Sequence, residues 1–140
     1  MYTGDVQVSF YLSVESVTFT PEEISRRIGS FDRCHRIGDP RGKTGKVWDK
    51  NEWEIVQQAS GPFRVTGDVF GSTLNILLSR LDGREEAFAE LAKAGDAVLR
   101  VVITSDGYPG ISLTPNQLTR LQRLGMSVDF DLYCDPKTSE

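Results

Sequence analysis

The segments VTFTPEEISRRIG (residues 17–29) and ISLTPNQLTRLQRLG (residues 111–125) share one phrase: Thr-Pro, a short polar helix and a closing Gly. The Thr hydroxyl can accept a hydrogen bond from a backbone N–H that the helix leaves free. Pro at the first helical position has no N–H to satisfy, and Gly adopts the left-handed conformation that ends many helices. The two segments therefore predict two short helices with similar ends, one near each end of the chain.

Alternating patterns precede the first phrase and follow the second. Residues 6–14 alternate apolar with polar side chains, and residues 128–134 do the same. A period of two indicates strands with one face toward the core and one toward solvent or a partner. A nearly continuous apolar run over residues 97–103 indicates a central strand that is covered on one face or on both.

The middle of the chain predicts further elements. Residues 47–56 indicate one strand or two short ones. Residues 73–81 and 84–94 carry helical apolar patterns that are separated by Asp82-Gly83. The stretch from Ser30 to Lys46 is rich in Gly, Pro, Arg and Lys, and we expect a long surface loop there.

The expected order is strand, helix, strand, helix pair, strand, helix, strand. Strand–helix–strand occurring twice is typical of a ferredoxin-like split βαβ sandwich, which is an α+β fold. We predict a mainly antiparallel sheet with helices on one face and two similar halves. A chain of 140 residues can bury a full core, so residues 1–140 are predicted to form a single domain.

Charge is distributed unevenly along the chain. Residues 26–50 contain eight Lys and Arg and three Asp, a charge of +5, whereas the whole chain carries −4, so the remainder carries −9. The acidic isoelectric point of about 5.1 argues against general nucleic-acid binding, which favours a basic face. The sequence has no signal-peptide pattern and no segment of membrane-spanning length. We expect a soluble cytoplasmic protein without membrane contact.

Three features resemble catalytic or metal-binding motifs but lack the necessary spacing. Cys34 and Cys134 lie a hundred positions apart, which fits neither a secreted disulfide framework nor zinc ligation, so we expect reduced thiols. His35 is the only histidine, and a zinc site or a Ser-His-Asp triad needs further ligands or a nucleophile elbow. Residues 38–44 place three residues between two glycines, where a phosphate-binding loop has four. We therefore predict no catalytic residue, no metal and no cofactor.

The chain resembles a known family in several segments. These are Phe10-Tyr11-Leu12, the phrase from Thr20 to Gly29, the strand that carries Trp53, and the ending from Leu124 to Tyr133. In these segments the sequence is similar to the bacterial family catalogued as domain of unknown function 4279. The resemblance implies bacterial origin and a small stand-alone cytoplasmic domain, and it implies no activity and no catalytic residue.

Acidic and aromatic residues share the outward face of the first and last strands. Asp129 and Asp131 lie two positions apart, so their carboxylates share one face about 6.5–7 Å apart. Tyr11 and Tyr133 have the same outward parity, on strands that we expect to be close in the sheet. Tyr supplies large contact area at low entropic cost, so this face is typical of a protein-recognition surface. A second layer or a homodimer covering the face would instead make these residues core.

Three hypotheses of function follow. The first is a non-catalytic protein-binding module, such as an immunity or antitoxin-type inhibitor of a basic toxin. It would use outward-facing strand residues and basic loop residues, namely Tyr11, Asp129, Asp131, Tyr133, Arg36, Arg41 and Lys43. The second is a small-molecule-binding regulatory domain that acts as a dimer. The third is a small hydrolase or metal-dependent enzyme using Asp129 and Asp131, because carboxylate pairs at this separation occur in such sites.

Overall fold

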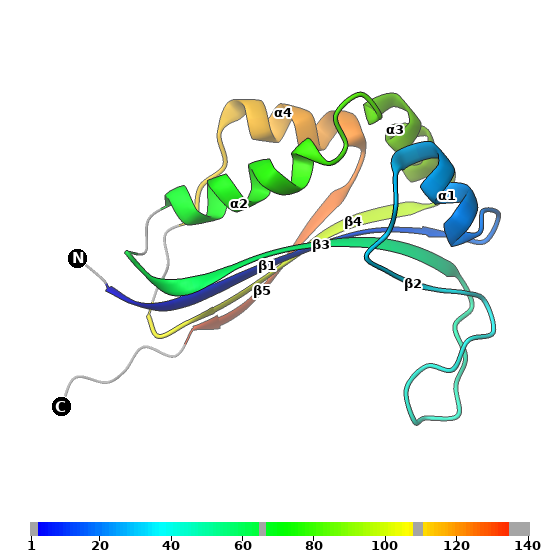
Figure 1. Ribbon diagram of the computed structural model, residues 1–140, viewed down its shortest axis with the longest axis horizontal. Helices are drawn as coiled ribbons and strands as arrows, with labels where there is room; N and C mark the ends of the chain where they lie inside the picture. The colour runs from blue at the N-terminus through cyan, green and yellow to red at the C-terminus, as the bar shows by residue number, and fades with distance from the viewer. Residues whose placement is uncertain (1–2, 65–66, 108–110, 135–140) are drawn as a thin grey trace.

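A computed structural model describes residues 3–64, 67–107 and 111–134, and in this part of the chain four helices cover a five-stranded sheet (Figure 1). In chain order the elements are β1 (Thr3–Ser16), α1 (Pro21–Ile28), β2 (Arg33–His35), β3 (Asn51–Arg64), α2 (Gly67–Ser79), α3 (Glu85–Ala94), β4 (Asp96–Ser105), α4 (Pro115–Leu124) and β5 (Ser127–Cys134). None of these helices has the length and apolar character that crossing a membrane requires.

The sheet has the strand order β2-β3-β1-β4-β5. β1 pairs antiparallel with β3 and with β4, and β2 pairs antiparallel with β3. The β4–β5 pair is parallel. The helices lie on one face of the sheet and leave the opposite face open (Figure 1). The predictions of an α+β fold, a mainly antiparallel sheet and helices on one face are therefore confirmed.

The ferredoxin-like arrangement with two similar halves is not confirmed. In a split βαβ unit, an antiparallel strand separates two parallel strands. Here β4 and β5 are direct neighbours, so the segment from β4 through α4 to β5 is not split. The segment from β1 through α1 to β3 ends in antiparallel neighbours instead. The two halves therefore have different strand connections, although α1 and α4 begin with the same capping box.

Both Thr-Pro phrases form the predicted helix starts. Thr20 Oγ1 accepts a hydrogen bond from the Glu23 N–H, and the Glu23 carboxylate accepts one from the Thr20 N–H, each at 3.2 Å. Thr114 and Gln117 make the same reciprocal pair at the start of α4. The Gln117 amide also donates to two oxygen atoms of α2, so this cap joins two helices.

The core lies between the sheet and the helices. The inward side chains of β1 from Val6 to Val14 are buried, as their alternation predicted. Trp53 on β3 is buried too, and its indole N–H donates to the carbonyl oxygen of Gly29 at 2.9 Å, which ties the end of α1 to the sheet. A Cβ at Gly95 would overlap the carbonyl oxygen of Glu15, so the close approach of the α3–β4 turn to β1 requires glycine.

Several expectations about individual segments are wrong. The stretch from Ser30 to Lys46 is not a plain loop, because it contains β2, which pairs with residues 52–54 of β3. The helix expected over residues 73–81 begins earlier, at Gly67, and ends at Ser79. Ladder pairing and tertiary contacts decide these limits, and a short window of sequence does not contain them.

The last strand also differs from the prediction. Its pattern matches that of β1, yet Phe130 and Leu132 are 42 % and 52 % exposed. β5 is an edge strand with a neighbour on one side, whereas β1 lies at the centre of the sheet. The tyrosines of the two strands are therefore not adjacent, because β4 lies between β1 and β5.

The two cysteines lie on opposite edges of the sheet. Cys34 belongs to β2 and Cys134 to β5, with three strands between them. Strands are spaced by about 4.8 Å, so the two edges are about 19 Å apart. A disulfide requires Cα atoms within about 7 Å. A bridge between these two residues within one chain is therefore excluded by geometry.

Removing either cap should destabilise the fold. Thr20→Ala and Thr114→Ala each delete the acceptor of a capping box, and we expect each to lower the free energy of unfolding by about 0.5–2 kcal/mol. Thr119→Ala is the matched control, because Thr119 is exposed inside α4, where Ala is favourable. Chemical denaturation followed by circular dichroism measures the midpoints. Unchanged midpoints in both cap variants would show that the caps contribute nothing.

Candidate functional site

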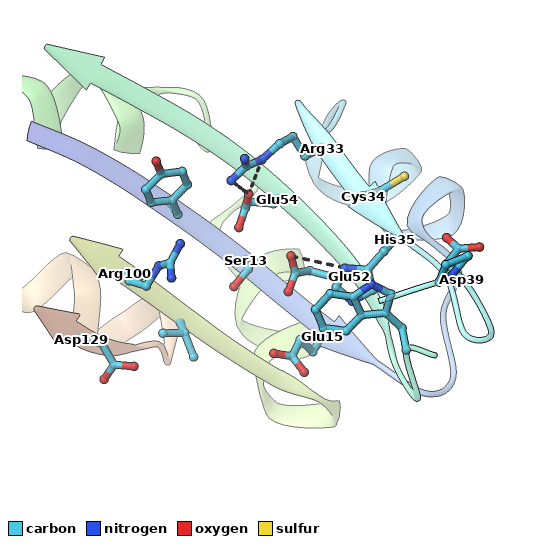
Figure 2. Close-up of a pocket in the computed structure, with 14 residues that line it drawn as sticks. Ser13, Glu15, Arg33, Cys34, His35, Asp39, Glu52, Glu54, Arg100 and Asp129 are labelled. Atoms are coloured by element: carbon cyan, nitrogen blue, oxygen red, sulfur yellow. Dashed lines mark hydrogen bonds and ion pairs between the residues drawn. The ribbon is translucent and has the colours of Figure 1, made fainter. Parts of the chain in front are cut away.

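The open face of the sheet is hollowed into a cleft of about 850 Å³ (Figure 2). Strands β1, β3 and β4 form its floor, and β2 and the hairpin loop, defined here as residues 36–50, form a wall. Five carboxylates line the cleft, from Glu15, Asp39, Glu52, Glu54 and Asp129. The basic and aromatic side chains that line it are Arg33, Arg100, His35, Tyr11 and Trp48.

Strand register sets these side chains in rows across the floor. Directly opposite residues on one face of a sheet have Cβ atoms about 4.5–5.5 Å apart, so their side chains interact. Three such rows cross the cleft: His35-Glu52-Glu15, Arg33-Glu54-Ser13 and Tyr11-Arg100-Asp129. The first row is acidic, and the third carries arginine beside tyrosine.

Glu52 is a carboxylate surrounded by other acids. Its side chain is 20 % exposed, and it lies directly opposite Glu15. Burial raises the pKa of Glu52 to about 7, and the negative charges of Glu54 and Glu15 contribute to the increase. Near neutral pH, Glu52 is therefore a mixture of its charged and neutral forms.

The neighbouring carboxylates have cationic partners. Glu54 accepts a hydrogen bond from Arg33 Nε at 2.8 Å, and Glu15 lies 3.8 Å from Lys50 Nζ. Glu52 instead lies 3.8 Å from His35 Nδ1. Across residues 3–64, 67–107 and 111–134, no lysine or arginine comes within ion-pair distance of Glu52. The acidic row therefore contains a carboxylate without a charged partner.

His35, at one end of this row, forms a flat wall together with Trp48. Their rings are stacked, with centroids 3.7 Å apart and planes inclined by 12°. Burial lowers the pKa of His35, and the nearby acids Glu15, Asp39 and Glu54 offset only part of that effect. The imidazole is thus largely neutral at pH 7 and does not neutralise Glu52. The guanidinium of Arg41, from the hairpin loop, lies 4.5 Å from the centre of the Trp48 ring.

Tyr11 lies between two guanidinium groups at the other end of the cleft. Arg33 and Arg100 lie 5.1 Å and 4.9 Å from the centre of its ring, within the range of cation–π contacts. These contacts hold both arginines on the sheet face. At this end of the cleft the arginines have carboxylates beside them, since Glu54 pairs with Arg33 and Asp129 lies opposite Arg100, whereas Glu52 lies beside His35 without a lysine or arginine.

The hairpin loop has a defined backbone. Gly38 N–H donates to the carbonyl oxygen of Trp48, Trp48 N–H donates to Asp39, and Arg41 N–H donates to Lys46, at 2.8–2.9 Å. At its base, Ile37 N–H donates to the Asn51 side chain at 3.0 Å. The loop projects from the sheet on the side opposite the helices (Figure 1). These hydrogen bonds give the loop a fixed conformation, in which Asp39, Pro40 and Trp48 line one side of the cleft.

The structure brings together some of the residues that we predicted from the sequence. Tyr11 and Asp129 line the cleft on either side of Arg100, and Arg41 stands at its Trp48 wall. Asp131 and Tyr133 lie further along the same face of β5, outside the cleft. Arg36 turns toward α1, where it pairs with Glu22. Lys43 is exposed on the hairpin loop.

The thiol beside the cleft is not activated. Burial raises the pKa of Cys34, and the charge of Asp39 adds to the increase, so the nucleophilic thiolate is disfavoured at neutral pH. In the described part of the chain, no group of three or more His, Cys, Asp and Glu residues is arranged to hold a metal ion. The chemical property that stands out is a carboxyl group that exchanges a proton near neutral pH.

Comparison with known proteins identifies the family. The family described as "Domain of unknown function (DUF4279)" matches residues 6–135, which is most of the chain. The chain belongs to the DUF4279 family. The resemblance noted in the sequence is thus confirmed. No curated protein and no solved structure matches this chain.

Sequence reasoning missed the acidic row of this DUF4279 domain. The sequence alone places His35 in a loop, because three residues of β2 are too few to show a pattern. Glu52 and Glu54 do alternate around buried Trp53, so their outward parity was available in the sequence. The missing information was the register that sets Glu52 opposite both His35 and Glu15.

Glu52→Gln should stabilise the folded protein above neutral pH. The pKa of Glu52 in the folded state, about 7, lies above the ordinary 4.5. Between these values the folded state binds more protons than the unfolded state, so stability falls as pH rises through this window. At about pH 8 we expect the variant to be more stable than the wild type by on the order of 1–3 kcal/mol.

The stabilities of Glu52→Gln and of the wild type are also compared at low pH, and a second Glu→Gln variant serves as the control. Near pH 4 both states hold the Glu52 proton, so the stability difference should become small. Glu90→Gln makes the same change on the exposed side of α3 and should show no such gain at high pH. Urea denaturation at both pH values measures the effect. A Glu52→Gln protein that is no more stable at about pH 8 would mean that the carboxylate is not under strain.

Proposed function

We propose that this chain is a cytoplasmic, non-catalytic protein-binding module whose partner contacts the open sheet face and the hairpin loop. The observation that supports the proposal is the cleft of about 850 Å³ on the face that the described helices leave uncovered. A partner could insert side chains into this concave surface and also pack against the projecting hairpin loop, and both contacts would bury surface with good shape complementarity.

The side chains of the cleft suit protein recognition. Tyr, Trp and Arg are enriched among the residues that dominate binding energy at protein interfaces. Guanidinium groups lie within cation–π range of Tyr11, and His35 stacks on Trp48, so little freedom of these two aromatic side chains would be lost on binding.

A specific form of the proposal is an immunity or antitoxin-type inhibitor. Five carboxylates line the cleft against two arginines and a largely neutral histidine, so the cleft is acidic. Such a surface complements a basic toxin and would speed its association at low salt. Three exposed basic residues of the hairpin loop that have no ion-pair partner among the described residues, Arg41, Lys43 and Lys46, would meet an acidic part of the same partner.

A small-molecule-binding regulatory domain is the second candidate. The cleft volume lies within the roughly 300–1,000 Å³ that is usual for ligand pockets. Half of its lining residues are charged, whereas such pockets are mainly apolar, and this favours the protein partner. An enzyme using Asp129 and Asp131 gains no support, because only Asp129 of this pair lines the cleft.

Selection from a phage-displayed library of random peptides tests the proposal before any natural partner has been identified. We expect enriched peptides to bind the wild type and to bind at least about tenfold more weakly to Ser13→Trp, which fills the centre of the floor. Gln122→Trp is the matched control, since Gln122 is exposed on α4 in the helix layer.

Circular dichroism verifies that both variants are folded, and binding is measured with synthetic copies of the enriched peptides. A library that yields no enriched peptide contradicts the proposal. So do enriched peptides that bind Ser13→Trp as tightly as the wild type. Should Ser13→Trp fail to fold, Tyr11→Ala, which shortens a side chain of the cleft, replaces it.

A further inference from the structure

The acidic row of the cleft has an uncompensated charge. Glu52 faces Glu15 on β1 and Glu54 follows on its own strand, and each of these two acids has a cation while Glu52 has none among the described residues. Like charges directly opposite one another in a sheet are unfavourable. A cation brought to this row from outside would remove that cost.

We propose that the occupant of the cleft is a basic segment of a protein partner, and that one Lys or Arg side chain of this segment lies against Glu52, beside the Trp48–His35 wall. The inference rests on the proposed protein-binding function and deepens it by naming the chemistry of the partner. It assigns the ligand contact to Glu52, a residue that has no partner of opposite fixed charge within the described chain.

The aromatic wall suits the same ligand. The apolar stem of a Lys or Arg side chain packs on an aromatic ring while its charged head reaches a carboxylate. Within the chain, Arg41 already makes such a contact, with its guanidinium 4.5 Å from the centre of the Trp48 ring on which His35 also stacks, so the partner's side chain would lie along the edge of this wall and reach Glu52. At the other end, Glu54 is already paired with Arg33, and the Arg100 guanidinium beside Tyr11 would repel a second cation, so the ligand's charge is directed toward the Glu52 end.

Binding at this position is coupled to proton release. A cation favours the ionised form of Glu52, so a ligand that arrives when the carboxyl is protonated displaces the proton. The groups that face Glu52 are Glu15 from β1, His35 and Arg33 from β2, Glu54 from β3 and Arg100 from β4. His35 also titrates, with its pKa lowered by burial, so the experiment must separate it from Glu52.

The test uses two capped pentapeptides, one with a central arginine and one with citrulline, its uncharged analogue of the same shape. The change in the NMR signal of the Trp48 indole N–H measures binding at about pH 6 and about pH 8. We expect the arginine peptide to bind about tenfold more tightly at the higher pH, as expected for a carboxyl of pKa about 7. The citrulline peptide should bind more weakly and with no dependence on pH.

Two variants identify the responsible group. Glu52→Gln should abolish the pH dependence and weaken binding of the arginine peptide at about pH 8, whereas Glu90→Gln on α3 should change neither. Equal binding of the two peptides, binding of neither, or a pH dependence that survives in Glu52→Gln would overturn the inference. If peptides selected from the library need the cleft but carry no Lys or Arg, the proposed function stands and this inference fails.

Discussion

The register in which β1 pairs with β3 and β4 is the constraint on which the other features depend. It places the apolar residues of β1 against the helices and the polar residues of β1 on the open face. There the polar residues lie directly opposite the outward-facing residues of β3 and β4. A slip of one residue would move every side chain of β1 to the opposite face. The buried half of β1 therefore fixes the position of Glu15 opposite Glu52, so the core determines the geometry of the cleft. Gly95 contributes by letting the α3–β4 turn approach Glu15 closely.

The acidic row lowers the stability of the folded protein, because it sets two carboxylates opposite each other, and the same row can bind a cation. Glu52 and Glu15 face each other on adjacent strands, and the arrangement persists because the core on the other side of the sheet holds both strands in place. Binding sites commonly retain such unfavourable arrangements, since the groups that a ligand needs are the groups that the free protein stabilises poorly. Glu54, in the next row, pairs with Arg33, whereas Glu52 has no lysine or arginine beside it among the described residues.

Local features of this fold could be predicted from the sequence, and long-range ones could not. The capping boxes at Thr20 and Thr114 depend on residues within four positions, and the alternation of β1 is visible in any short window. The sheet order and the existence of β2 depend on pairing between distant segments. Parity placed Tyr11 and Asp129 on the open face, where they line the cleft. His35 and Glu52 become a site only once β2 is known to pair with β3.

The central claim is that Glu52 is a strained carboxylate held ready for a cation, and its own titration tests this most directly. NMR detection of the side-chain carboxyl carbon in the wild-type protein, with Glu52→Gln used to assign the signal, gives the midpoint. We predict a midpoint of about 7, which moves down when the arginine peptide is added. A midpoint near the ordinary 4.5, unaffected by the peptide, would contradict the account.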